Sequence, residues 1–144
     1  MSRIEDIVAC EQLIRRFAWL NDAGQYEQLA ALFTDDGLFA RPSQPDAPVL
    51  GREAILASFQ ARPPRYTRHV VSNILVDVIG GDRAVALSTV VLYVADHCEG
   101  EPPYPSTGPV MVGSFEDALV KRDGRWLFAS RFGSLALSQA PVPR

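Results

Sequence analysis

The sequence has few residues of the types that build metal centres and disulfide frameworks. It contains two cysteines, Cys10 and Cys98, and two histidines, His69 and His97. The spacing within each pair matches neither a zinc site nor a disulfide framework. We therefore expect both cysteines to be buried free thiols, and the sequence predicts no metal and no cofactor.

Clusters of positive charge are also missing. The 14 Lys and Arg residues are outnumbered by 17 Asp and Glu, which gives a formal net charge of −3. The basic residues are scattered along the chain, whereas a protein that neutralises phosphates needs them gathered in a patch or stripe. Nucleic acid is therefore not an expected partner.

Long apolar runs are absent as well. No run approaches the roughly 20 residues that a membrane span requires. The first residues include Glu5, Asp6 and Glu11, where a signal peptide would need an uninterrupted apolar core. These features predict a cytoplasmic protein with no membrane partner.

The remaining composition is that of an ordinary globular domain. Hydrophobic residues make up 47% and charged residues 22% of the 144 residues. A chain of this length fits one domain, here residues 1–144, and buries roughly 68–70% of its unfolded surface. That is enough to enclose a pocket of ligand size.

The first part of the chain has helical signals. A capping-box pattern at Ser2–Glu5 predicts the start of a helix whose apolar residues recur at helical spacing until Gly24. A second, short helix is expected over residues 25–33. A third is expected over residues 52–62, because Pro63 and Pro64 prevent its continuation.

The second part of the chain changes to a strand pattern. Segments rich in β-branched and aromatic residues are separated by turn sequences, and they are Tyr66–Ile79, Ala84–Ala95, Val110–Lys121 and Trp126–Leu137. They are longer than an average strand of about 5–6 residues. We therefore predict an α+β fold with a strongly bent antiparallel sheet.

Three polar residues do not fit this apolar pattern. His69 and Asn73 are four residues apart in a strand, so a regular strand would point both to the same side, together with Thr67. Asp22 lies in the last turn of the first helix, at the margin of its apolar face. A carboxylate there opposes the helix macrodipole, so we expect a partner that offsets this cost.

The order of these segments resembles a known family. The matching segments are "FAWLNDAGQYEQLAALFTDDGLF", "LGREAILASF", "TRHVVSN" and "GSFEDALVKRDGRWLFASR". They are similar to the SnoaL-like branch of the nuclear transport factor 2-like superfamily over nearly the whole chain. The resemblance implies a cone-shaped α+β barrel, in which three N-terminal helices pack on a strongly curved, mainly antiparallel sheet around a pocket. It also implies a homodimer or a higher homo-oligomer.

Enzymes of this family include scytalone dehydratase, bile-acid dehydratase, hexachlorocyclohexane dehydrochlorinase and polyketide cyclases. By resemblance, Asp22 and His69 correspond to an Asp–His dyad, and Arg131 to an assisting basic residue of the last strand. Asn21 stands where scytalone dehydratase has a tyrosine, and a second histidine has no match. The resemblance implies a cofactor-independent lyase or isomerase, with dehydration, dehydrohalogenation, isomerisation and cyclisation all open.

The expected ligand is a small hydrophobic or cyclic, polyketide-like molecule. Asn73 and Arg131 are candidates to stabilise the negative charge that develops on the departing or enolising oxygen. Aromatic residues expected to line a cavity are Phe17, Trp19, Phe39 and Phe115. The alternatives are that these residues form an ordinary core, that His69 is only a hydrogen-bonding group, and that the domain is a non-catalytic binding or dimeric interaction module.

Overall fold

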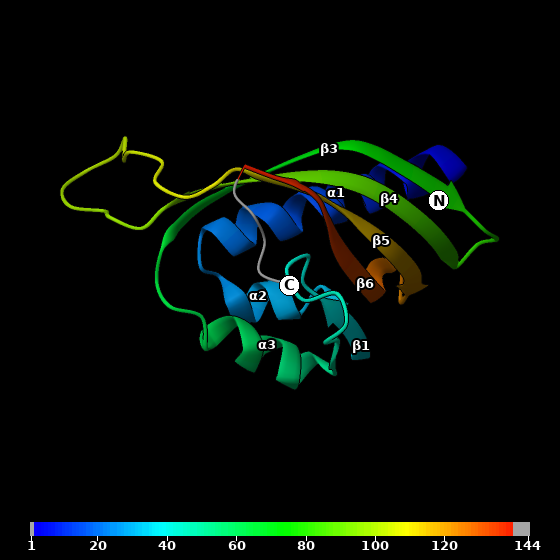
Figure 1. Cartoon of the computed structure of the whole chain (residues 1–144). Coiled ribbons are helices and arrows are strands. Elements are labelled where there is room, and N and C mark those ends of the chain that lie inside the picture. The colour runs from blue at the N-terminus through cyan, green and yellow to red at the C-terminus, as the bar shows by residue number, and fades with distance from the viewer. Residues whose placement is uncertain (1, 140–144) are drawn as a thin grey trace.

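The computed structural model describes residues 2–139, and its helices lie on one side of a curved sheet (Figure 1). The helices are α1 (Arg3–Asp22), α2 (Tyr26–Ala30) and α3 (Arg52–Gln60). The strands are β1 (Phe33–Ala40), β2 (Val49–Leu50), β3 (Tyr66–Val78), β4 (Arg83–Ala95), β5 (Met111–Arg122) and β6 (Arg125–Ser138). The predicted helices and long strands are thus present, with ends that differ by a few residues.

The six strands form one mixed sheet that is not closed. The order is β2-β1-β6-β5-β4-β3, and every pairing is antiparallel except that of β1 with β6. The last four strands form a meander whose β5–β6 turn is Asp123–Gly124, with φ of 51° and 75°. The predicted α+β class and curved, mainly antiparallel sheet are confirmed. The strand β2 and the parallel pairing of β1 were not predicted.

The first helix is fixed at both ends. Ser2 and Glu5 form the predicted capping box, and Gly24, with φ of 69°, follows the last turn. Near its start, Asp6 accepts hydrogen bonds from Lys121 Nζ at 3.0 Å and from Trp126 Nε1 at 2.9 Å. These bonds hold the start of α1 against β5 and β6, and they lower the pKa of Asp6.

The core fills the space between the helices and the concave face of the sheet. Its centre is aromatic, because the Phe17 ring lies within 6.2 Å, centroid to centroid, of five other phenylalanine rings: Phe33, Phe39, Phe59, Phe115 and Phe128. Cys10 is buried, and burial raises the pKa of its thiol to about 12. Cys98 is exposed in the loop that follows β4, so the prediction that both thiols are buried was wrong for Cys98. The apolar alternation of β4 ends at Ala95, before this residue.

The long β4–β5 loop projects from one end of the sheet (yellow in Figure 1). At this end β3 and β5 begin and β4 and β6 finish, close to the last turn of α1. Among residues 2–139, no helix has the length and apolar character needed to cross a membrane.

Candidate active site

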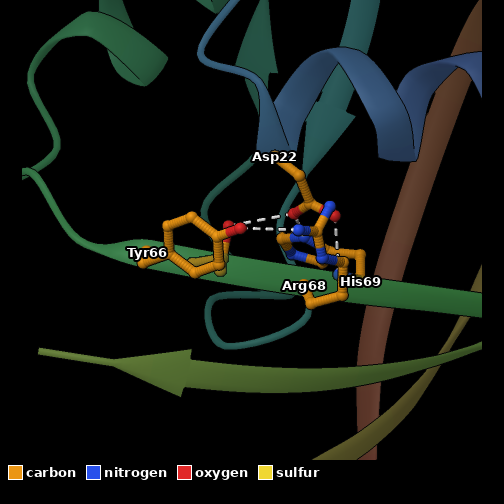
Figure 2. A network of polar contacts seen from close by, with 5 residues as sticks. Asp22, Tyr66, Arg68 and His69 are labelled. Atoms are coloured by element: carbon orange, nitrogen blue, oxygen red, sulfur yellow. Dashed lines mark hydrogen bonds and ion pairs between the residues drawn. The ribbon is translucent and has the colours of Figure 1, made fainter. Parts of the chain in front are cut away.

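The carboxylate of Asp22 is bound to three groups of β3. Thr67 Oγ1 donates to Asp22 Oδ1 at 2.9 Å, and the backbone N–H of His69 donates to Oδ2 at 2.8 Å. The imidazole Nδ1 of His69 lies 2.5 Å from Oδ1. Figure 2 shows Asp22 reaching down from the end of α1 to His69 on the strand. The structure thus brings together the two residues that the sequence placed 47 positions apart.

These contacts explain how a carboxylate is tolerated at the end of α1. The Asp22 side chain is only 4% exposed and that of His69 17% exposed. Three hydrogen bonds offset both the burial of the charge and its position at the negative end of the helix dipole. A carboxylate can only accept, so Nδ1 of His69 carries a proton in this contact. In the neutral imidazole, Nε2 is then the unprotonated nitrogen.

An interior cavity of about 540 Å³ adjoins the histidine. His69 lines it, whereas Asp22 does not. Much of the remaining wall is apolar and includes three of the predicted residues, namely Phe17, Phe39 and Phe115. The arrangement places a hydrogen-bonded imidazole beside a space large enough for a small cyclic molecule.

Two predicted cavity residues lie elsewhere. Trp19 is 68% exposed, because it lies on the side of α1 that faces solvent. Asn73 is exposed and has φ of 52° at a β-bulge between Ser72 and Leu75. The bulge interrupts the alternation of the strand, so Asn73 does not share the side of His69 and its amide contacts Thr89 Oγ1 at 3.4 Å. The prediction that Asn73 and His69 point to the same side of the strand was therefore wrong.

Arg131 lies in the core and does not line the cavity. It is fully buried, and its Nε is 3.1 Å from Asp117 Oδ1. Its guanidinium carbon lies 4.4 Å from the ring centre of Phe17 and 3.9 Å from that of Phe115. Arg131 therefore contacts two cavity-lining rings from the core side. The family resemblance suggested that it contacts the ligand, but the structure does not place it at the cavity.

Polar residues that the sequence analysis missed also line the cavity. Arg41 follows β1, Arg62 and Arg65 follow α3, and Asp96 follows β4. Burial lowers the pKa of Arg62 to about 10, and the charges of Arg41 and Arg65 contribute. The available signal was an arginine beside proline at the end of an element, in "ARPS" and "ARPPR".

The fold and the site together define a class: a cone-shaped α+β domain with an Asp–His pair at the wall of an interior cavity. The sequence model of the SnoaL-like domain matches residues 2–132. The chain belongs to the SnoaL-like domain family, as its sequence resemblance indicated. Within the described residues 2–139, no group of three His, Cys, Asp or Glu side chains is arranged to hold a metal ion.

Solved structures agree with this assignment. A proposed scytalone dehydratase from Novosphingobium aromaticivorans is 25% identical, with 98% of this chain and 91% of that chain covered and a TM-score of 0.80. A protein of unknown function from Mycobacterium tuberculosis is 28% identical, with coverages of 97% and 80% and a TM-score of 0.74. A type 2 hexachlorocyclohexane dehydrochlorinase, 18% identical with coverages of 95% and 89%, shares the fold at a TM-score of 0.78. No curated protein matches the chain.

Proposed function

We propose that this protein is a cofactor-independent lyase or isomerase that removes a proton from a small, largely hydrophobic cyclic molecule. The observation that carries this proposal is the 2.5 Å contact between Asp22 Oδ1 and His69 Nδ1 beside the cavity. Histidine is the side chain best suited to exchange a proton near neutral pH. A carboxylate on its other nitrogen is the partner that such a base requires.

In this mechanism His69 is the general base and Asp22 orients it. Nε2 accepts a proton from a carbon or hydroxyl group of the ligand, and the imidazole becomes a cation. Asp22 stabilises that cation and keeps the ring in the tautomer in which Nε2 is free. Asp22 does not take the proton itself. General acid–base catalysis of this kind contributes about 10²–10⁴-fold in rate.

Negative charge that develops on the ligand needs a donor on the cavity wall. Arg131 and Asn73 do not line the cavity, so they are poor candidates for direct contact. Asn21 does line it, one residue before Asp22, and its amide offers N–H donors. We assign the charge-stabilising contact to Asn21.

The solved structures support this reaction class. A proposed dehydratase has the same fold at 25% identity, and a dehydrochlorinase shares the fold. Both names describe elimination reactions, which begin with or include removal of a proton. Dehydration, dehydrohalogenation, double-bond isomerisation and ring closure all remain compatible with the geometry.

The test detects proton removal whatever step follows it. The protein is incubated in D2O with a panel of cyclic ketones, cyclic alcohols and halogenated rings, and deuterium uptake and product formation are followed by NMR and mass spectrometry. We expect uptake or elimination with the wild type, and its loss by about 10²–10⁴-fold in His69→Ala. Circular dichroism checks that the variant is folded. Unchanged activity in His69→Ala would refute the mechanism.

The alternative is a non-catalytic binding module that uses the same cavity. The aromatic walls formed by Phe17, Phe39 and Phe115 favour it, because they bind a ring without requiring any chemistry. In that case a ligand would stay bound and unchanged over long incubation in D2O, and Asp22→Asn would not alter its affinity.

We also assign homodimer formation to the outer face of the sheet. Large apolar side chains are exposed at outward positions of β3, β4 and β6: Leu75, Val85, Leu87 and Phe132. On β5, Glu116 lies between Leu87 and Phe132 and pairs with both. Exposed apolar side chains that gather on one face indicate association. Sedimentation velocity is expected to show a dimer for the wild type and a monomer for Leu87→Glu. A monomeric wild type would contradict the assignment.

A further inference from the structure

Three guanidinium groups gather where the cavity meets solvent. Arg41 directly follows β1, whereas Arg62 and Arg65 flank the two prolines after α3, and all three line the same cavity as His69. The protein as a whole has a formal charge of −3. The three arginines therefore give this part of the cavity wall a positive charge, opposite in sign to the net charge of the chain.

Contacts within the described part of the chain do not satisfy these arginines. Among residues 2–139, no carboxylate lies within the 4.0 Å ion-pair distance of Arg41, Arg62 or Arg65. Arg41 Nη2 donates to the carbonyl oxygen of Ser58 at 3.4 Å, near the C-terminal end of α3. That contact suits the helix dipole, but it occupies a single donor of a group that has five.

Arg62 is held in place without having its donors satisfied. Its guanidinium carbon lies 4.0 Å from the ring centre of Phe59, which is a cation–π contact. Its Nε is buried and has no hydrogen-bond partner among the described residues. A buried donor without an acceptor is unfavourable. The structure thus fixes a cation at the cavity wall and leaves it able to bind an acceptor from outside the chain.

The three charges also act on one another. Burial is the main cause of the lowered pKa of both Arg62 and Arg41, and neighbouring arginines lower each further. For Arg62, Tyr26 acts in the opposite direction, but burial and the neighbouring arginines prevail. An anion placed between the guanidinium groups would relieve the repulsion and supply the missing acceptors, and a planar carboxylate matches the fork of an arginine.

We infer that the natural ligand is an organic acid, whose carboxylate binds Arg41, Arg62 and Arg65 at the mouth of the cavity. Its apolar ring lies against Phe17, Phe39 and Phe115, so that a carbon or hydroxyl group of the ring faces His69. Asp96 lines the same cavity and repels an acid from its own side, which orients the carboxylate toward the arginines. The inference rests on the proposed function in that both assign the ligand to this cavity.

The test compares two probes of the same size that differ in charge, 2-naphthoate and 2-naphthamide. Calorimetry with the full chain is expected to show 2-naphthoate binding about tenfold or more tightly than 2-naphthamide at low salt. The preference should shrink as NaCl is raised, because salt screens the exposed part of the site. Equal affinities, or binding of neither probe at millimolar concentration, would overturn the inference.

Variants locate the preference. Arg62→Gln and Arg65→Gln should each weaken 2-naphthoate by about tenfold and change 2-naphthamide by less than about twofold. Arg65 is exposed, so Arg65→Gln keeps the test valid if Arg62→Gln does not fold. The matched control is Arg83→Gln, the same charge change at the opposite end of β4, which should alter neither affinity. An equal loss in Arg83→Gln would reject a local site.

Two further outcomes separate this inference from its alternatives. Inorganic phosphate that displaces 2-naphthoate at equal concentration would overturn the assignment to a carboxylate and indicate a phosphorylated ligand. Probe binding requires no proton transfer. A preference for 2-naphthoate without deuterium uptake in any compound would therefore retain the arginine site and reject the dyad, whereas uptake without the preference would reject the arginine site alone.

Discussion

Two acid–base pairs each join two secondary-structure elements, and they differ in how well their side chains are hydrogen-bonded. Asp22 and His69 link α1 to β3 at the open end of the domain, and each oxygen of the carboxylate accepts at least one hydrogen bond. Asp117 and Arg131 link β5 to β6 in the core, where the ion pair has an N–O distance of 3.1 Å. Despite that distance, neither side chain makes a hydrogen bond of good geometry within residues 2–139.

The difference lies in what surrounds each pair. His69 lines the cavity, so its second nitrogen can meet a ligand. Arg131 is enclosed by aromatic rings, and burial lowers its pKa although Asp117 opposes this. A buried charge is a candidate for chemistry only when it is both oriented by hydrogen bonds and open to a ligand. By that criterion the first pair is a site and the second is part of the scaffold.

The largest effect expected from this comparison is on turnover. Asp22→Asn preserves the shape of the side chain, but its amide can donate to Nδ1 and so favours the tautomer in which Nε2 carries the proton. We expect turnover of any substrate found in the D2O screen to fall by about 10²–10⁴-fold. Asp117→Asn should lower turnover far less, because Asp117 does not line the cavity.

The tautomer gives a readout that a merely structural role would not move. Long-range ¹⁵N NMR of His69 should show the proton on Nδ1 in the wild type and on Nε2 in Asp22→Asn. His97 is exposed and serves as the internal reference. An unchanged His69 spectrum would show that Asp22 does not set the tautomer, and the two pairs would then not differ as argued.

The next largest effect is on stability, and here the order of the pairs reverses. Arg131→Met removes the cation and leaves Asp117 buried beside an apolar side chain. Breaking a buried ion pair in this way destabilises a protein by about 3–5 kcal/mol. Urea unfolding should show a loss of this size for Arg131→Met at neutral pH and a clearly smaller one for His69→Gln, whose site is partly open to water.

The double variant Asp117→Leu with Arg131→Met sharpens the point. Replacing both members of a buried ion pair by apolar residues of similar volume is often neutral or stabilising, by about 1–4 kcal/mol. We expect the double variant to recover the stability lost in Arg131→Met. If it stays as unstable as the single variant, the pair has a structural role that apolar packing cannot replace.

A smaller effect should follow pH. Burial raises the pKa of Asp117 to about 6, although Arg131 opposes the rise. The folded state therefore keeps this proton over a range in which the unfolded chain has lost it. The contribution of Asp117 to stability is full below the ordinary pKa of 3.8 and is lost as pH rises through about 6. The urea midpoint of the wild type minus that of Asp117→Asn should fall as pH rises through that range.

The contribution of Asp6 to stability should change with pH in the opposite direction in the same experiment. Hydrogen bonds from Lys121 and Trp126 lower the pKa of Asp6. Its contribution is therefore present above the ordinary pKa and is lost as pH falls through the lowered value. As pH falls, the difference in urea midpoint between wild type and Asp6→Asn should shrink, whereas the difference between wild type and Asp117→Asn should grow. Parallel pH profiles for the two variants would contradict the contrast between hydrogen-bonded and unbonded carboxylates.

The sequence predicted the elements well because their signals are local. A capping box, a helix-ending glycine, a proline pair and a turn such as Asp123–Gly124 each act within a few residues. A carboxylate at a helix C-terminus and a histidine in an apolar strand each break a local rule, so both residues were recognisable as candidates. Their pairing was implied only by the family resemblance, and the structure shows the contact at 2.5 Å.

The failures arose where the outcome depends on distant parts of the chain. Asn73 was assigned to the wrong side because a bulge changes the alternation of a strand without a distinct sequence signal. Arg131 was assigned to the site by family resemblance, which gives its strand but not its depth, and the rings that enclose it come from α1, β5 and β6. Arg41 and Arg62 were missed because each becomes part of the cavity only in the folded domain, where segments distant in the sequence meet.

The smallest expected effect concerns the hydrogen bond from Thr67 to Asp22. Thr67→Val keeps the β-branched shape and removes the 2.9 Å bond to Oδ1, while both contacts with His69 remain. Loss of one such bond lowers the free energy of unfolding by about 0.5–1.5 kcal/mol. We expect turnover to fall by no more than about tenfold, because the carboxylate still orients the imidazole. Urea unfolding and rate measurements on the same preparation compare the two losses. A fall in turnover as large as that of Asp22→Asn would mean that Thr67, and not the aspartate alone, determines where the imidazole points.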